Sequence, residues 1–127
     1  MLFFWLFMLL MDLLIPLTMV YFGRRFLKEP PDRINPAYGY RTAMSMKNMD
    51  TWRFAHEYCG RLWYRLGLIL LPLSAIALLF VMGRDTERIA AVGLAVCAVQ
   101  ILPLAGALIP TEAALRRHFD KNGKRRS

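Results

Sequence analysis

A single carboxylate inside a long apolar run is the first residue in this sequence that could do chemistry. Asp12 is the only charged residue among the first 22. A carboxylate near the middle of a membrane span costs about 2.5–3.5 kcal/mol on insertion scales, so it needs polar neighbours. Pro16 has no N–H to donate to the Asp12 carbonyl, which therefore also needs a donor. Ser74 and Gln100 fall at a similar depth in two later apolar runs, and the pattern predicts a polar trio with Asp12.

Three interpretations of Asp12, Ser74 and Gln100 stay open, and in one of them the first span is shifted so that Asp12 lies nearer the outer interface. Hydrogen bonds between spans hold helices together and are worth on the order of 1 kcal/mol each, and we favour this interpretation. A carboxylate that faces the interior of a helical bundle can also bind a proton or a ligand.

The second candidate is the tripeptide Tyr40-Arg41-Thr42. The guanidinium of Arg41 presents five donors in a rigid fork that suits phosphate or carboxylate. Beside an inner leaflet it could hold a lipid head group or a peptide carboxylate. In the alternative, Arg41 caps a helix or pairs with Glu57 or Asp50 and folds the loop, which we favour slightly because a buried Arg usually needs an internal partner.

His56 and Glu57 look like the start of the zinc motif H-E-x-x-H, but Gly60 stands where the second His belongs. Cys59 is too near along the helix to converge on the same ion. We therefore predict no metal site and no cofactor, and expect His56 to hydrogen-bond within the loop near Trp52 and Gly60. No nucleophile–base pair or nucleotide-binding motif appears, so we also predict no enzyme.

Three apolar runs must position these residues. They cover about residues 1–22, 62–82 and 89–109, and each is long enough to cross a bilayer, which takes about 20 residues. The hydrophobic fraction of 57% exceeds the roughly 45–50% of soluble domains. The sequence predicts an all-α membrane protein with three transmembrane helices in a single domain, residues 1–127.

The basic residues predict the orientation of these spans. Nine Lys and Arg lie between residues 23 and 65, six lie in the tail at 111–127, and only two lie in the turn between the second and third spans. The positive-inside rule then places the N-terminus outside and the segment 23–61 and the tail in the cytoplasm, which predicts a multi-pass protein of the bacterial inner (cytoplasmic) membrane. The same rule accounts for the net charge of +8, so we expect membrane lipids and no nucleic acid as partners.

A helix is expected between the first two spans. It would begin near Asp50, with Asn48 or Asp50 as N-cap. Apolar residues recur at helical spacing on one face and charged residues on another, which predicts an amphipathic helix that lies at the membrane surface and turns into the second span. The apolar residues are Trp52, Ala55, Cys59, Leu62, Trp63 and Leu66, and the charged residues are Arg53, Glu57, Arg61 and Arg65.

The third span contains small residues four apart, as in Ala91/Ala95 and Gly93/Cys97. Such pairs permit close helix approach, within one chain or between copies. Three helices alone enclose little interior, so we expect a homo-oligomer.

The motif around Arg41 resembles the SdpI family of small bacterial membrane proteins. The resemblance runs from about Ile34 to the C-terminus and includes the Pro110-Thr111-Glu112 exit from the third span. Its residues are Asn35, Gly39, Tyr40, Arg41, Thr42, Ser45, Trp52, His56 and Gly60.

This resemblance implies an immunity-type protein that protects a cell against a membrane-active peptide toxin, or one that signals at the envelope. It also implies that the motif residues bind a ligand or partner. Longer members of the family carry further spans ahead of the motif, whereas this sequence has one. The alternatives are a small transporter or lipid-handling protein that uses Asp12 or Arg41, and an accessory subunit of a larger membrane complex.

Overall fold

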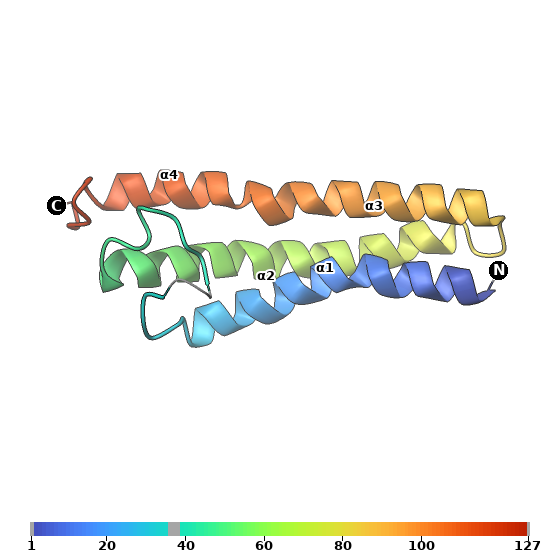
Figure 1. Ribbon diagram of the computed structural model, residues 1–127, viewed down its shortest axis with the longest axis horizontal. Coiled ribbons are helices and arrows are strands. Elements are labelled where there is room, and N and C mark those ends of the chain that lie inside the picture. Colours follow the sequence, from blue (N-terminus) through green and yellow to red (C-terminus); the bar gives the residue numbers. More distant parts are fainter. Residues whose placement is uncertain (1, 36–38, 127) are drawn as a thin grey trace.

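The computed structural model describes residues 2–35 and 39–126 and contains four helices in this part of the chain. They are α1 (Leu2–Lys28), α2 (Met49–Leu79), α3 (Thr86–Gly106) and α4 (Leu108–His118). These four helices form three rods that lie side by side (Figure 1). Helix α4 continues the line of α3 after a break at Ala107, so the two helices make one rod. All three rods are long and apolar enough to cross a membrane, which confirms the predicted all-α, multi-pass architecture.

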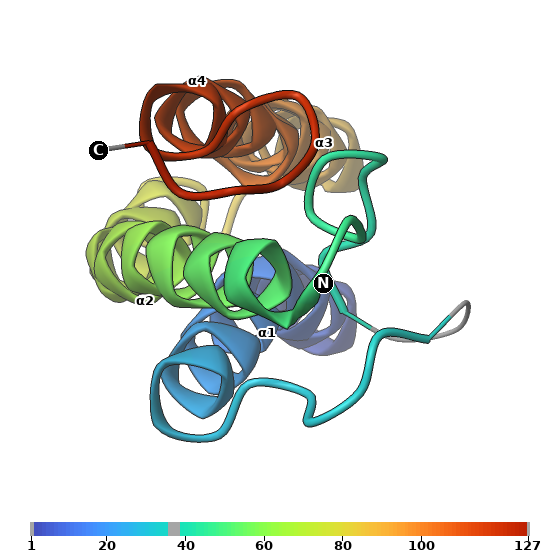
Figure 2. The ribbon, with the colours of Figure 1, turned by 90° about the vertical axis from the view of Figure 1, so that its left-hand side faces the viewer.

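The two ends of the bundle differ in character. The N-terminus and the α2–α3 turn lie at one end, and the loop 29–48 and the C-terminus lie at the other (Figure 1). Seen end-on, α2 lies between α1 and α4, and residues 39–48 of the loop run beside α2 and the α3–α4 rod (Figure 2). We call the second end the basic end, because the Lys- and Arg-rich segments 23–65 and 111–126 meet there.

Glycines allow α1 and α2 to touch through their backbones. A Cβ added to Gly23 would lie 2.6 Å from the Gly60 carbonyl oxygen, and one added to Gly60 would lie 2.8 Å from the Gly23 carbonyl oxygen. At Gly67 an added Cβ would lie 2.9 Å from the Pro16 carbonyl oxygen. Side chains at these positions would force the helices apart, so Gly60, a residue of the family-like motif, serves helix packing.

Helix α2 starts with a capping box. The Thr51 N–H donates to Asn48 Oδ1 (3.0 Å), and the Asn48 N–H donates to Thr51 Oγ1 (3.1 Å), so Asn48 is the N-cap. The helix then continues without a break to Leu79, so the expected turn from a surface helix into the second span is wrong. Trp52 and Ala55 are fully buried against the protein while Arg53 is exposed.

Hydrophobic clusters close both ends of the bundle. At the N-terminal end, Trp5 packs with Leu78 and Ile89, and its Nε1–H donates to the Leu78 carbonyl (2.7 Å). At the basic end, Leu115 and Phe119 pack on Ala55. The rods are therefore fixed relative to one another at each end.

The C-terminal tail is folded, which the sequence did not reveal. Helix α4 occupies much of the segment expected to be a polar tail, and Phe119 after it is fully buried. The chain turns back so that Arg126 Nε donates to the carbonyls of Arg116 and Phe119, both at 3.0 Å. Asn48 Nδ2 donates to the Gly123 carbonyl (2.6 Å), which ties this turn to the start of α2.

Candidate functional site

His56 organises the polar contacts at the basic end. It is fully buried in α2, and its Nε2 accepts a hydrogen bond from the Tyr40 backbone N–H (2.8 Å). Because that N–H can only donate, the ring proton is on Nδ1, which donates to the Trp52 carbonyl (2.7 Å). Trp52 Nε1 in turn donates to the Pro31 carbonyl (2.8 Å). The loop 29–48 is thereby attached to α2 at Pro31 and at Tyr40.

This arrangement leaves His56 no nitrogen for a metal. Both ring nitrogens already have partners, and the ring packs on Trp52 and Phe26 at centroid distances of 4.3 and 4.8 Å. Within residues 2–35 and 39–126, no group of three His, Cys, Asp or Glu side chains gathers as metal ligands would.

Gly39 is required where the loop meets His56. Its φ is +106°, a conformation that side chains disfavour, and an added Cβ would collide with His56 Nε2. The glycine of the family-like motif therefore lets the backbone approach the imidazole closely enough for the Tyr40 N–H to reach it.

Thr42 and Ser45 form a compact turn after Arg41. The Thr42 N–H donates to Ser45 Oγ (2.9 Å), and the Ser45 N–H donates to Thr42 Oγ1 (3.1 Å). Ser45 Oγ lies 3.0 Å from the Tyr40 carbonyl, to which it can donate, and Thr51 Oγ1 lies 3.0 Å from the Ser45 carbonyl. These contacts fix the loop backbone on both sides of Arg41.

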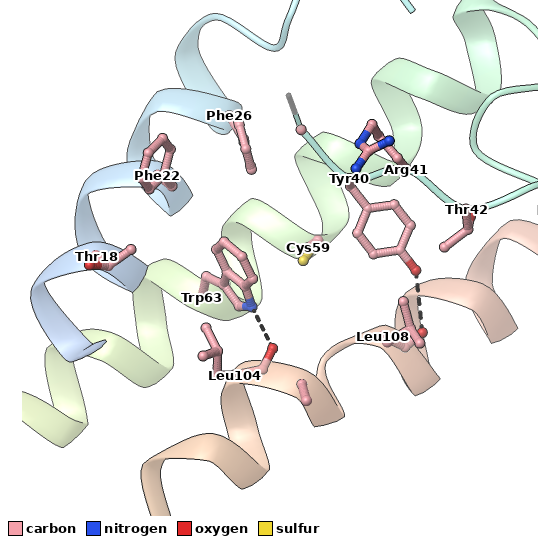
Figure 3. A pocket seen from close by; sticks show the side chains of 12 residues that line it. Thr18, Phe22, Phe26, Tyr40, Arg41, Thr42, Cys59, Trp63, Leu104 and Leu108 are labelled. Carbon is pink, nitrogen blue, oxygen red and sulfur yellow. Dashed lines mark hydrogen bonds between the residues drawn. The ribbon is translucent and has the colours of Figure 1, made fainter. Parts of the chain in front are cut away.

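A cavity of about 550 Å³ lies beneath this loop, between α1, α2 and the α3–α4 rod (Figure 3). We call it the Arg41 cavity. Its walls are mostly apolar, and the loop residues 39–42 form its outer wall. Its lining residues are Thr18, Phe22, Phe26, Gly39, Tyr40, Arg41, Thr42, Cys59, Trp63, Leu104, Ala105 and Leu108.

Two aromatic residues fix the walls of this cavity. Trp63 Nε1 donates to the Leu104 carbonyl (3.2 Å), and the Tyr40 hydroxyl lies 3.4 Å from the Leu108 carbonyl (Figure 3). The same hydroxyl lies 3.2 Å from Glu112 Oε1. Burial and then the Glu112 carboxylate raise the pKa of Tyr40 above its ordinary value, so the hydroxyl remains a donor. Sequence reasoning had used Trp63 only as part of an apolar helix face and had given Glu112 no role.

Arg41 lies at the cavity with no internal partner. Its side chain is exposed, and among the residues that the structure describes it makes no ion pair or hydrogen bond. The expected pairing with Glu57 or Asp50 is absent, and both of those side chains are exposed. The guanidinium is therefore free to bind an anion.

The remaining motif residues serve the fold around the cavity. Asn35 Nδ2 donates to the Arg33 carbonyl (3.0 Å), and Trp52 and Gly60 are buried in α2 away from the cavity lining. Of the motif residues assigned to ligand binding from sequence, only Gly39, Tyr40, Arg41 and Thr42 line the cavity.

The structure brings the intramembrane trio together. Gln100 Nε2 donates to the Asp12 backbone carbonyl and to Ser74 Oγ, both at 2.7 Å. The first bond supplies the donor that Pro16 cannot. Asp12 Oδ1 accepts from Cys97 Sγ (3.0 Å), a contact that sequence reasoning missed because Cys97 was read only as a small residue.

Two acceptor atoms in this cluster have no partner. Asp12 and Gln100 are fully buried, yet Asp12 Oδ2 and Gln100 Oε1 accept no hydrogen bond from any residue that the structure describes. Hydrogen bonding between spans therefore accounts for Gln100 Nε2 and Ser74 but not for these two buried oxygens.

Fold and site together define a small helical membrane protein with an apolar, arginine-bearing cavity at one end. The family model for the SdpI/YfhL protein family matches residues 32–111, well over half of the chain, so the protein belongs to this family. The matched region contains residues 32–48 of the loop, all of α2 and α3, and the Arg41 cavity apart from its α1 side. Comparison with curated proteins and with solved structures finds no match.

Proposed function

We propose that this protein is an immunity-type protein that binds a membrane-active peptide at the Arg41 cavity and keeps it from damaging the bilayer. The observation that carries the proposal is the free guanidinium of Arg41 beside an apolar cavity whose outer wall is built by the family's own motif region.

The chemistry of the cavity suits one end of such a peptide. Arg41 can pair with a carboxylate through two parallel hydrogen bonds, which are about twice as strong as neutral ones. The apolar walls then bury the neighbouring side chains, at roughly 25 cal/mol per Å² of apolar surface removed from water or head groups. The loop is already fixed by His56, Ser45 and Thr51, so little ordering opposes binding.

The orientation is part of the proposal. The Lys and Arg of segments 23–65 and 111–126 favour the basic end in the cytoplasm of the bacterial inner membrane. The cavity then lies at the inner leaflet and meets a peptide that has inserted through the membrane. A reporter that works only in the cytoplasm, fused after the last residue, would be inactive if this orientation were wrong.

A protection assay tests the function. A sensitive bacterium expresses the wild-type protein, Arg41→Ala or the control Arg61→Ala, which removes an exposed charge of α2 that does not line the cavity. Cells are challenged with membrane-active peptides, each in a free-carboxylate and a C-terminally amidated form. We expect wild type and Arg61→Ala to protect against a free-carboxylate peptide, and Arg41→Ala to lose that protection at equal membrane expression.

The amidated peptides supply the sharper comparison. If Arg41 holds the terminal carboxylate, wild-type cells are protected less against the amidated peptide than against the free-carboxylate peptide. Arg41→Ala should then not lower protection against the amidated peptide any further. Equal protection by wild type and Arg41→Ala, or none by any variant against any peptide, would refute the proposal.

A further inference from the structure

The Arg41 cavity runs along the helices of the bundle. On α1 it runs from Thr18, deeper in the span, to Phe26, and on the α3–α4 rod it runs from Leu104 to Leu108. Arg41 and Thr42 lie at the end nearest the loop (Figure 3). The cavity therefore has a charged end at the level of the basic loop and an apolar end that points toward the bilayer centre.

The apolar end is open to the surrounding lipid. Thr18, Ala105 and Leu108 line the cavity and are also exposed on the outside of the bundle. A hydrocarbon chain of the bilayer can therefore enter from the side without crossing a polar barrier. The volume of about 550 Å³ falls in the range of roughly 300–1,000 Å³ that small-molecule sites occupy.

The charged end selects the head group. Arg41 is the one charged residue that lines the cavity, and it has no partner among the described residues. Glu112 is not among the lining residues, and its Oε1 lies 3.2 Å from the Tyr40 hydroxyl. A phosphate oxygen matches the guanidinium fork, and Trp63 and Tyr40 are the amphipathic aromatics typical of the head-group level.

We propose that the Arg41 cavity binds one anionic phospholipid of the surrounding bilayer, with its phosphate on Arg41 and one acyl chain along Phe22, Trp63 and Leu104. This lipid is the resting occupant of the site. The inference does not depend on the peptide-binding role, because every contact it uses is available in the absence of any peptide.

Fluorescence quenching in bilayers of defined composition tests this proposal. The purified protein is placed in phosphatidylcholine vesicles with an increasing share of phosphatidylglycerol that carries brominated chains. Bromine quenches indole fluorescence on contact, so the protein carries Trp5→Phe, which removes the tryptophan at the other end of the bundle. Of the two that remain, Trp52 is fully buried and Trp63 lines the cavity. The same series with brominated phosphatidylcholine in unbrominated phosphatidylglycerol measures head-group selection in the opposite direction.

Three variants separate the head-group contact from the chain contact. Arg41→Gln should raise the share of brominated phosphatidylglycerol needed for half-maximal quenching about fivefold, the effect of one basic residue near an anionic lipid. Arg61→Gln, an exposed charge of α2 outside the cavity lining, should leave it unchanged. Ala105→Phe should place its ring in the cavity and weaken quenching by both brominated lipids.

The outcomes decide the proposal. Equal effects of Arg41→Gln and Arg61→Gln would show only general attraction of anionic lipid to the basic end and would overturn it. Unchanged quenching in Ala105→Phe would show that no chain enters the cavity and would also overturn it. The protection assay tests the peptide-binding role separately. If the protein protects cells but does not select phosphatidylglycerol, the lipid proposal is refuted and the peptide-binding proposal stands.

Discussion

The contact between Gly39 and His56 gives the most direct test of how the loop is fixed. Gly39 has φ of +106°, and an added Cβ would collide with His56 Nε2. Gly83 supplies a matched control, because its φ is +80° and an added Cβ there has no atom within 4 Å. Gly83→Ala therefore measures the cost of the backbone conformation alone. Gly39→Ala measures that cost together with the cost of the collision with His56.

The magnitude follows from these two contributions. A positive φ costs a non-glycine residue of order 1–3 kcal/mol. At Gly39 the methyl group must also displace His56, which loses the Tyr40 N–H (2.8 Å) and leaves buried Nε2 without a donor, at about 1–3 kcal/mol. We therefore expect Gly39→Ala to lower the free energy of unfolding by about 1–3 kcal/mol more than Gly83→Ala does.

Reversible unfolding in mixed micelles, with increasing sodium dodecyl sulfate, measures both variants on one scale. In a Trp5→Phe background, tryptophan fluorescence reports the loss of the basic end, because Trp52 packs on His56 at a centroid distance of 4.3 Å and Trp63 lines the Arg41 cavity. If the two variants were destabilised equally, the imidazole would not restrain the loop, and His56 would have no part in fixing the wall of the cavity.

Two further predictions concern the polar contacts. Gln100→Met should lower the free energy of unfolding by about 1–3 kcal/mol, because it removes both 2.7 Å hydrogen bonds of Nε2. A double-mutant cycle with Ser74→Ala should give a coupling energy of about 1 kcal/mol between the two side chains. Additive effects of the two substitutions would contradict the interaction. The backbone N–H groups of Lys124 and then Asn122 hold the pKa of Asp120 below its ordinary value. The stabilising effect of this turn should therefore be complete above the ordinary Asp pKa and be lost as the pH falls through the lowered value. NMR titration of the Asp120 carboxyl and hydrogen exchange of the Lys124 amide would measure this. Protection of the Lys124 amide that does not change as Asp120 is protonated would refute the prediction.

The helices follow from the sequence because their signals are local. Apolar runs of about 20 residues predict spans whatever the rest of the chain does. Asn48 followed by Thr51 three residues later sets the start of α2, as the capping box shows. The need of the Asp12 carbonyl for a donor also follows from one residue, Pro16, and Gln100 supplies it at 2.7 Å.

The Arg41 cavity does not follow from local signals. Its walls come from three rods, and its outer wall is a loop whose position depends on Gly39 reaching His56 across 17 residues of chain numbering. The folded tail was missed for a similar reason. Phe119 is buried where the chain turns back and Arg126 donates to the Arg116 carbonyl of α4. No periodic pattern in the sequence predicts this turn.

The expectation that Arg41 pairs inside the protein was wrong for an instructive reason. It assumed that the loop needs a charge pair to fold, whereas neutral hydrogen bonds already hold the backbone on both sides of Arg41, through His56, Ser45 and Thr51. Arg41 contributes none of those bonds. A long, always-charged side chain without an internal partner adds little to the stability of the fold, which supports the proposed binding role of Arg41. The same independence makes Arg41 variants a clean probe, because changes at this residue alter the charge of the site and leave the loop contacts in place.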